Sequence, residues 1–126
     1  IKNNNNVCLN FYWPSLEKQI IVIGNANRIP QKESDDYFNS RPHGSQIGAI
    51  VSNQSEIIES RDVLERKFDE LNNYYSKIRP KKPANWGGYI VKPDLFEFWQ
   101  GRKNRLHDRL EFKLDGNIWN SNRLSP

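Results

Sequence analysis

The chain has 126 residues, of which 27% are charged and 12% aromatic, and its formal net charge is +4. This length fits one domain with a substantial core, and the composition is ordinary for a globular protein. There is no apolar run of transmembrane length and no cluster of cysteine and histidine, so the sequence predicts neither a membrane protein nor a metal site. The single cysteine excludes an internal disulfide and fits a reducing compartment, and we therefore expect a cytoplasmic location.

The first half of the chain predicts two strands followed by two short helices. The strands are expected over Val7–Trp13 and Gln19–Gly24, and the helices over Pro30–Ser40 and Gly44–Val51. The first strand is rich in strand-forming residues, and the second is so continuously apolar that we expect it to be buried on both faces. A bulge at Gly24 would let the second strand continue through Asn25–Ile29. The first helix opens with proline and acidic residues, as helix N-termini prefer.

The second half predicts one long helix and then β structure. Ser60 is a plausible N-cap, and apolar residues recur at spacings of three and four as far as Ile78. The proline-bearing stretch Arg79–Asn85 is predicted to be a solvated linker. Strands are expected over Tyr89–Val91, Leu95–Gln100, Arg105–Leu114 and Ile118–Leu124, with a tight hairpin at Asp115-Gly116. Since no strand–helix–strand series recurs, we expect a single, mainly β domain that resembles a small barrel, with one long helix and short helices.

The most informative stretch is Phe96–Arg109, in which Arg105, His107 and Arg109 occupy alternate positions. Alternate residues of a strand share a face, and like charges on one face repel unless an anion lies among them. The pattern favours a site for a phosphorylated or otherwise anionic ligand. The alternative is a solvent-facing strand whose charges form salt bridges with Glu97, Asp108 or Glu111.

Two further groups could contact such a ligand. Tyr37, Arg41 and Ser45 are spaced by four, and hydroxyl and guanidinium groups can clamp a phosphate. The alternative places Tyr37 in the core and leaves the other two solvated. Gln54 and Ser55 precede a helical segment and could bind a heteroaromatic edge or a phosphate, unless Ser55 simply caps the helix.

Trp99 could stack on a flat ring or fill the core. Nucleophile-elbow, P-loop and dinucleotide-binding motifs are not found, so hydride chemistry would have to come from a cofactor. The positive charge suits phosphorylated small molecules or nucleic acid. Because the basic residues are scattered, we do not expect nucleic-acid binding.

Several blocks of the sequence resemble one enzyme family, in the same order and over nearly the whole chain. They are Ser40–Ser55 (SRPHGSQIGAIVSNQS), Ser60–Phe68 (SRDVLERKF), Trp86–Tyr89 (WGGY), Glu97–Gly101 (EFWQG), Arg105–Arg109 (RLHDR) and Arg123–Pro126 (RLSP). Together they resemble the C-terminal two-thirds or so of pyridoxamine 5'-phosphate oxidase.

The resemblance implies an FMN-binding split barrel that works as a homodimer with flavin at the subunit interface. It implies oxidation of pyridoxamine 5'-phosphate or pyridoxine 5'-phosphate to pyridoxal 5'-phosphate, with dioxygen as acceptor and release of hydrogen peroxide. By position, the substrate-phosphate clamp would be Tyr37, Arg41 and Ser45. The residues that hold the substrate pyridine for catalysis would be Arg105 and His107. The FMN contacts would be Gln19, Gln54, Ser55, Trp99 and Arg109.

The sequence also departs from the family pattern. The family's upstream strands, which carry FMN-phosphate ligands, are not in the sequence, and we expect them to precede Ile1. Ile50 stands where the family usually has tryptophan. The alternative to an oxidase is therefore a non-catalytic fragment that binds pyridoxal 5'-phosphate or phosphate without a complete flavin site.

Overall fold

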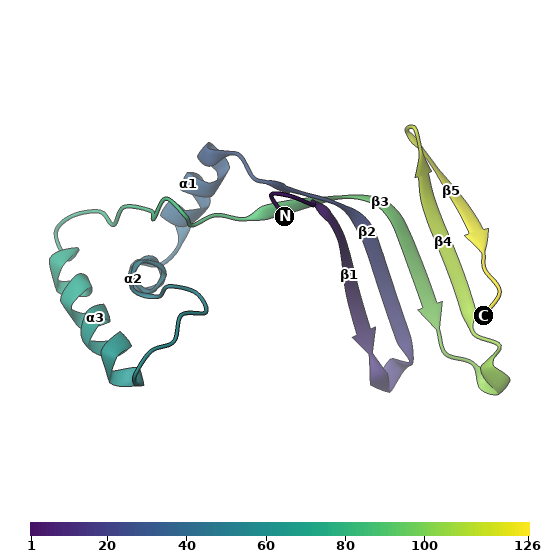
Figure 1. The fold of residues 1–126 in the computed structure, drawn as a ribbon, viewed down its shortest axis with the longest axis horizontal. Coiled ribbons are helices and arrows are strands. Elements are labelled where there is room, and N and C mark those ends of the chain that lie inside the picture. The colour runs from purple at the N-terminus through teal and green to yellow at the C-terminus, as the bar shows by residue number, and fades with distance from the viewer. The chain divides into compact units, whose positions relative to one another are not determined.

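The computed structural model describes residues 1–126 and divides them into two compact units. The sheet unit comprises Ile1–Arg28 and Tyr89–Pro126, and the helical unit comprises Ile29–Gly88. Figure 1 shows the helices and strands of each unit. None of the helices is long and apolar enough to cross a membrane.

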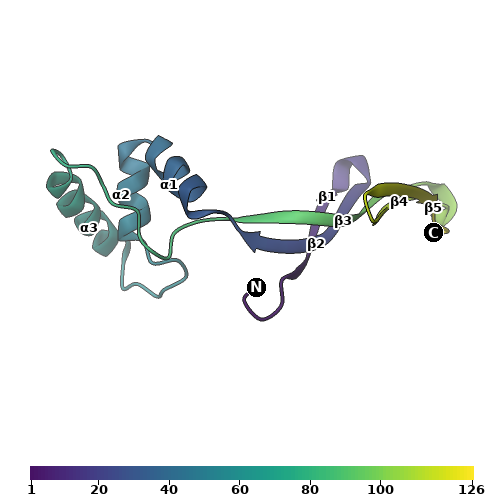
Figure 2. The ribbon, with the colours of Figure 1, turned by 90° about the horizontal axis from the view of Figure 1, so that it is seen from above.

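The sheet unit is a five-stranded antiparallel sheet in which each strand pairs with the next along the chain (Figures 1 and 2). The strands are β1 (Asn6–Trp13), β2 (Lys18–Arg28), β3 (Tyr89–Gln100), β4 (Asp108–Asp115) and β5 (Ile118–Arg123). Two short 3₁₀ turns, η1 (Pro14–Leu16) and η2 (Lys103–Arg105), join β1 to β2 and β3 to β4. This architecture confirms a β-rich fold without strand–helix–strand repeats.

The predicted bulge in β2 is confirmed, because the register between β2 and β3 shifts between Ile23 and Gly24. A Cβ atom at Gly24 would lie 2.2 Å from the carbonyl oxygen of Lys92 and 2.7 Å from Cα of Pro93. Only glycine allows this approach of two backbones. The bulge also explains how Pro93 fits inside β3, since the ladder is irregular there.

The sheet has one apolar and one polar face, because residues paired across an antiparallel ladder point the same way. The apolar face comprises Leu9, Phe11, Trp13, Ile20, Val22, Phe96, Phe98, Leu110, Phe112 and Trp119. Phe11 and Phe98 keep 47% and 41% of their surface exposed. The expectation that β2 is buried on both faces is wrong, since Ile23 is 39% exposed.

The predicted strand Arg105–Leu114 is shorter than expected. β4 begins only at Asp108, because Asn104 and Arg105 adopt left-handed backbone angles with φ of 59° and 62°. The strand alternation that would place Arg105, His107 and Arg109 on one face is therefore wrong for the first two. The β4–β5 hairpin is confirmed, with Gly116 at φ 59° in its tight turn.

The helical unit contains α1 (Gln31–Ser40), α2 (His43–Val51) and α3 (Arg61–Tyr74), and confirms all three predicted helices. Ser60 is the N-cap of α3 as expected, although its side chain makes no capping hydrogen bond. The helix ends at Tyr74 rather than Ile78, after a pair of asparagines that favour helix less than the preceding residues do. The core of this unit is built on Phe38 and Ile47, which are completely buried.

The linker that follows α3 is not uniformly solvated, which corrects the prediction for Arg79–Asn85. The side chain of Lys82 is only 7% exposed, and its Nζ lies 3.3 Å from Oδ1 of Asp35 in α1. The same ammonium donates a hydrogen bond of 3.0 Å to the carbonyl of Trp86. A lysine is buried in this way only when it is paired.

Candidate functional site

The sheet unit aligns three of the predicted FMN contacts in one row. Gln19 of β2 pairs with Trp99 of β3, and Trp99 pairs with Arg109 of β4. All three side chains are half-buried and lie on the polar face. The row therefore presents an amide, an indole and a guanidinium side by side.

Arg109 is held in this row by a carboxylate that sequence reasoning had considered only as a solvated partner. Its Nε and Nη2 donate to the two oxygens of Glu97 at 2.9 and 3.0 Å, and its Nη1 donates to the carbonyl of Ser125 at 3.0 Å. The hydrogen bonds that Arg109 donates to Glu97, and then the charge of this carboxylate, raise the pKa of Arg109 above its ordinary value. Three of the five N–H groups are thus engaged, which leaves two for a ligand.

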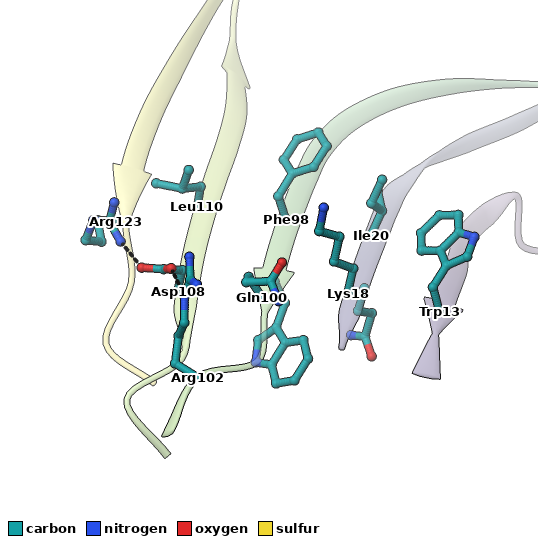
Figure 3. A pocket seen from close by; sticks show the side chains of 11 residues that line it. Trp13, Lys18, Ile20, Phe98, Gln100, Arg102, Asp108, Leu110 and Arg123 are labelled. Atoms are coloured by element: carbon teal, nitrogen blue, oxygen red, sulfur yellow. Dashed lines mark hydrogen bonds and ion pairs between the residues drawn. The ribbon is translucent and has the colours of Figure 1, made fainter. Parts of the chain in front are cut away.

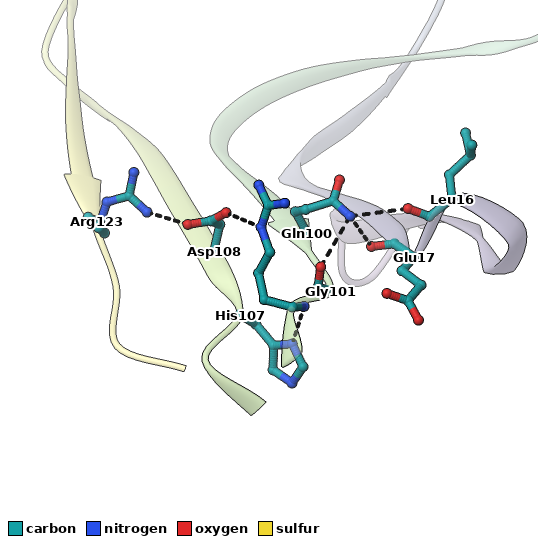
Figure 4. Close-up of polar contacts among 8 residues, drawn as sticks. Leu16, Glu17, Gln100, Gly101, His107, Asp108 and Arg123 are labelled. Carbon is teal, nitrogen blue, oxygen red and sulfur yellow. Dashed lines mark hydrogen bonds and ion pairs between the residues drawn. The ribbon is translucent and has the colours of Figure 1, made fainter. Parts of the chain in front are cut away.

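His107 joins the row through Trp99. The two ring centroids are 4.9 Å apart, with the planes tilted by 43°. Nδ1 of His107 accepts a hydrogen bond of 3.1 Å from the backbone N–H of Arg102 (Figure 4). In a neutral imidazole the other nitrogen then carries the proton, so Nε2 of His107 is a hydrogen-bond donor.

Arg105 lies in η2 and is exposed, and it forms no ion pair with a carboxylate. Its left-handed backbone is uncommon for a residue with a long side chain, and such strain gathers at functional positions. Arg105 and His107 therefore lie in the connection between β3 and β4, and not on one face of a strand.

A side-chain amide fastens this turn to the β1–β2 connection. Nε2 of Gln100 donates to the carbonyls of Leu16 and Glu17 at 3.2 Å each (Figure 4). The backbone N–H of Gly101 also donates to the carbonyl of Glu17, at 2.7 Å. A Cβ at Gly101 would lie 2.7 Å from Cβ of Glu17. Sequence reasoning missed Gln100, although it sits beside Trp99 in the EFWQG block.

The carboxylate of Asp108, at the start of β4, forms ion pairs with two arginines. Nε of Arg102 and Nη1 of Arg123 each lie 2.7 Å from a different oxygen of the carboxylate (Figures 3 and 4). Hydrogen bonds from Arg102 and then from Arg123 lower the pKa of Asp108 below its ordinary value. Asp108 therefore stays ionised and fixes the turn that carries His107.

A cavity of about 470 Å³ opens next to this ion-pair network (Figure 3). Its walls come largely from the apolar face, with Trp13, Ile20, Phe98 and Leu110, and the Arg102–Asp108–Arg123 network closes one end. Gln19 and Trp99 also border it, whereas Arg105 and His107 do not.

The helical unit brings two of the three predicted phosphate ligands together on one indole. The rings of Tyr37 and Trp86 are stacked, with centroids 6.0 Å apart, and Cζ of Arg41 lies 5.3 Å from the centroid of Trp86. Tyr37 is 61% exposed, so the alternative that it fills the core is wrong, and its neighbour Phe38 is the core residue. Ser45 follows in the first turn of α2, where its N–H donates to the carbonyl of Pro42 at 2.9 Å.

The corner between α1 and α2 is fixed by a buried amide. Gln46 is 5% exposed, and its Nε2 donates to the carbonyls of Phe38, Asn39 and Arg41 at 3.0, 3.3 and 3.0 Å. These carbonyls lie at the C-terminal end of α1, where the helix itself supplies few donors. That of Phe38 also accepts the backbone N–H of Arg41 at 3.3 Å. Gln46 thereby sets the backbone from which Arg41 projects.

Gln54 and Ser55 lie in the turn after α2, and both are exposed. Ser55 has φ of 66°, and the N-cap of α3 is Ser60, so the alternative in which Ser55 caps a helix is wrong. The structure leaves both polar side chains in an exposed turn of the helical unit.

Solved structures identify the fold class. A PhzG structure from Burkholderia lata 383, in complex with tetrahydrophenazine-1-carboxylic acid, is 28% identical with a TM-score of 0.81, and the match covers 98% of this chain and 60% of that one. An FMN-binding protein from Nostoc punctiforme, related to pyridoxamine 5'-phosphate oxidase, shares the fold at 12% identity and a TM-score of 0.64, over 99% and 65% of the two chains. The chain has the fold of the FMN-binding split barrels.

Sequence comparison gives the family. The family model for pyridoxamine 5'-phosphate oxidase matches residues 1–75, and the model for the pyridoxine 5'-phosphate oxidase C-terminal dimerisation region matches residues 86–126. The chain belongs to the pyridoxamine 5'-phosphate oxidase family.

Two curated relatives are similar over the whole chain. The pyridoxine/pyridoxamine 5'-phosphate oxidase of Flavobacterium psychrophilum is 54% identical over 127 residues, which cover 100% of this chain and 59% of the relative. The chloroplastic oxidase 1 of Arabidopsis thaliana is 49% identical over 132 residues, which cover 100% of this chain and 25% of that protein. The chain thus spans 59% of the length of its bacterial relative.

Proposed function

We propose that the natural polypeptide carrying this chain oxidises pyridoxamine 5'-phosphate or pyridoxine 5'-phosphate to pyridoxal 5'-phosphate in the cytoplasm, with FMN as cofactor and dioxygen as final acceptor. The observation that carries the proposal is the pair of Tyr37 and Arg41 on Trp86, in a chain 54% identical to such an oxidase. Arg41 has no carboxylate partner, so its charge is available for a phosphate.

The residues of the polar row suit FMN. Gln19 and the two free N–H groups of Arg109 can donate to the carbonyl oxygens and ring nitrogens of a flavin, and Trp99 offers a flat apolar surface. We assign Gln54 and Ser55 to FMN on the family resemblance alone. When bound, FMN supplies the acceptor for the hydride that leaves C4' of the substrate.

The chain's own residues would bind and orient the substrate. Tyr37, Arg41 and Ser45 would hold its phosphate, with Arg41 able to bind two oxygens at once. Arg105 would hold the pyridine, and Nε2–H of His107 would donate a hydrogen bond to a substrate oxygen or nitrogen. The contact between the rings of Trp99 and His107 places His107 next to the row that we assign to FMN.

We also propose that the protein is a homodimer. Residues 86–126 match a dimerisation region, and the apolar sheet face exposes Phe11, Trp13, Phe98 and Trp119. A contiguous exposed apolar surface of this kind is typical of a protein interface.

The test uses the natural polypeptide. It should take up FMN, show flavin absorbance, and release hydrogen peroxide when given pyridoxine 5'-phosphate. Arg105→Ala and His107→Ala should lower turnover while FMN remains bound. A protein that neither binds FMN nor turns over substrate, but binds pyridoxal 5'-phosphate, would instead be the non-catalytic binding protein. Unchanged turnover in both variants would mean that the substrate residues are wrongly assigned.

A further inference from the structure

We propose that Trp86 is a positioning residue for phosphate recognition: its ring holds Arg41 and Tyr37 in place, and its own backbone is anchored by Lys82. This inference rests on the proposed function, because it assigns Arg41 to the substrate phosphate. It adds a residue outside the predicted site and a reason for the burial of a lysine in the preceding linker.

The ring of Trp86 is the common surface of three side chains from α1 and its C-terminal end. Tyr37 stacks on it with an interplanar angle of 24°, Phe38 meets it edge-on at 5.2 Å, and the Cζ atom of Arg41 lies 5.3 Å from its centroid. Phe38 is completely buried, so the indole is anchored to the core, and it also contacts the exposed Tyr37 and the half-buried Arg41.

The backbone of Trp86 is fixed independently of its ring. Its carbonyl accepts a hydrogen bond of 3.0 Å from Lys82 and one of 3.5 Å from the hydroxyl of Ser34. Its N–H donates to the carbonyl of Pro83 at 3.0 Å. Lys82 is in turn paired with Asp35 of α1. The segment is therefore tied to the same helix that supplies Tyr37.

An indole holds arginine in a way that suits phosphate binding. A carboxylate partner would occupy the N–H groups of Arg41 and neutralise its charge, whereas a ring contacts only the face of the guanidinium. The edge with its N–H groups stays free to bind a phosphate with two parallel hydrogen bonds. The contact also limits the rotamers of a long side chain, which reduces the entropy lost on binding.

The experiment measures, by calorimetry, the binding of two ligands to the FMN-loaded natural protein. One is 4-deoxypyridoxine 5'-phosphate, which lacks the C4' hydroxyl group of the substrate. The other is the same compound without its phosphate. We expect Trp86→Leu to weaken binding of the phosphorylated ligand about tenfold, the range of a desolvated cation–π contact. Binding of the dephosphorylated ligand should stay unchanged. Trp86→Phe should retain most of the affinity, because it keeps an aromatic face.

Three controls make the outcome decisive. Tyr74→Leu removes another exposed aromatic ring of the same unit and should leave both affinities unchanged. Arg41→Ala should weaken binding of the phosphorylated ligand. The double variant Arg41→Ala/Trp86→Leu should lose no further affinity, because the effects of coupled residues are not additive. Turnover of pyridoxine 5'-phosphate by Trp86→Leu should show a raised KM and an unchanged kcat.

The failures are distinguishable. If Arg41→Ala leaves phosphate affinity intact, the proposed function of the clamp is wrong. If Arg41→Ala weakens binding but Trp86→Leu does not, only the role of Trp86 is wrong. Equal weakening of both ligands by Trp86→Leu would assign it a merely structural role. Should Trp86→Leu fail to fold, Lys82→Met, which removes the anchor and keeps the ring, must show the same selective loss, and an unchanged affinity there overturns the proposal.

Discussion

Arg109 donates two hydrogen bonds to one carboxylate, from Nε to Oε1 of Glu97 at 2.9 Å and from Nη2 to Oε2 at 3.0 Å. Paired, parallel hydrogen bonds fix the plane of a guanidinium as well as its position. Because Trp99 is the cross-strand neighbour of Arg109, this pair sets the geometry of the row to which we assign FMN. The two interpretations of Phe96–Arg109, a ligand site and a strand with salt bridges, are therefore compatible. Arg109 forms the salt bridge and keeps two N–H groups for a ligand.

Replacing Glu97 with glutamine should therefore disturb the cofactor site. The amide can accept only one of the two hydrogen bonds, and Arg109 gains freedom to rotate. We expect FMN to bind about tenfold more weakly, the range of one charge-assisted hydrogen bond, as measured by titration of flavin fluorescence. Glu111→Gln is the matched control, because it removes the same charge from the position directly opposite Glu97. If both variants weaken FMN binding equally, the negative charge near Arg109 matters for FMN binding and the two hydrogen bonds to Glu97 do not.

Two glycines offer an opposite pair of predictions about stability. Gly24→Ala should lower the free energy of unfolding by about 1–3 kcal/mol, because its Cβ would collide with the backbone of Lys92. Gly48→Ala should raise it by about 0.5–1 kcal/mol, since Gly48 lies inside α2 and a Cβ there meets nothing within 4 Å. Urea unfolding measures both. A stable Gly24→Ala variant would show that the bulge can shift its register.

The elements that could be predicted from the sequence are those whose cause is local. Apolar periodicity and turn residues predicted β1, β2, the three helices and the β4–β5 hairpin, and a glycine inside an apolar run predicted the bulge. The left-handed turn at Asn104 and Arg105 could not be predicted in this way, because neither residue is glycine. It is held by contacts around it, including the N–H of Arg102 on His107.

The parts of the candidate site that escaped prediction depend on distant partners. From its sequence context, in a proline-bearing linker, Lys82 is expected to be solvated. Its burial depends on the ion pair with Asp35, which is distant in the sequence. Trp86 stands out in the sequence only as an aromatic before two glycines, and its contact with Arg41 joins positions 45 residues apart. In contrast, the row of Gln19, Trp99 and Arg109 could have been found from strand register alone, had the pairing been known.

Gln46 provides a test of the corner that presents Arg41. Gln46→Leu removes the donor to three carbonyls and should lower the free energy of unfolding by about 1–3 kcal/mol. Gln46→Glu places a carboxylate against the same oxygens, so burial and repulsion should raise its pKa, and this variant should become more stable as the pH falls and the group is protonated. Thermal unfolding across pH measures this slope. If the stability of Gln46→Glu does not depend on pH in this way, its side chain has moved away from the corner between α1 and α2.

The tautomer of His107 leads to a prediction about two conservative variants. The amide of asparagine can replace Nδ1, which accepts from Arg102, whereas the amide of glutamine reaches the position of Nε2. If the donor toward the substrate is Nε2–H, His107→Gln should keep about tenfold more of kcat/KM for pyridoxine 5'-phosphate than His107→Asn, the range of one hydrogen bond. The reverse order would mean that His107 acts mainly by holding the turn.

The Arg102–Asp108–Arg123 network should show in the pH dependence of stability. Hydrogen bonds from Arg102 and then Arg123 lower the pKa of Asp108 below 3.8 in the folded protein. A lowered folded-state pKa means that the stabilisation is fully present above the unfolded value of 3.8 and is lost as the pH falls through the folded value. We expect the free energy of unfolding to fall more steeply below about pH 4 in the natural protein than in Asp108→Asn.

Urea unfolding between about pH 6 and pH 2 measures this difference, a range that brackets the ordinary pKa of aspartate. The curves of the natural protein and of Asp108→Asn should be separated above pH 3.8 and converge at the acid end. Asp94→Asn is the control, because Asp94 is an exposed carboxylate of β3 without an ion-pair partner, and its curve should run parallel to that of the natural protein. Parallel curves for Asp108→Asn would show that the two arginines do not stabilise the turn through this carboxylate. The role of the network in holding His107 would then fall to the Arg102 backbone alone.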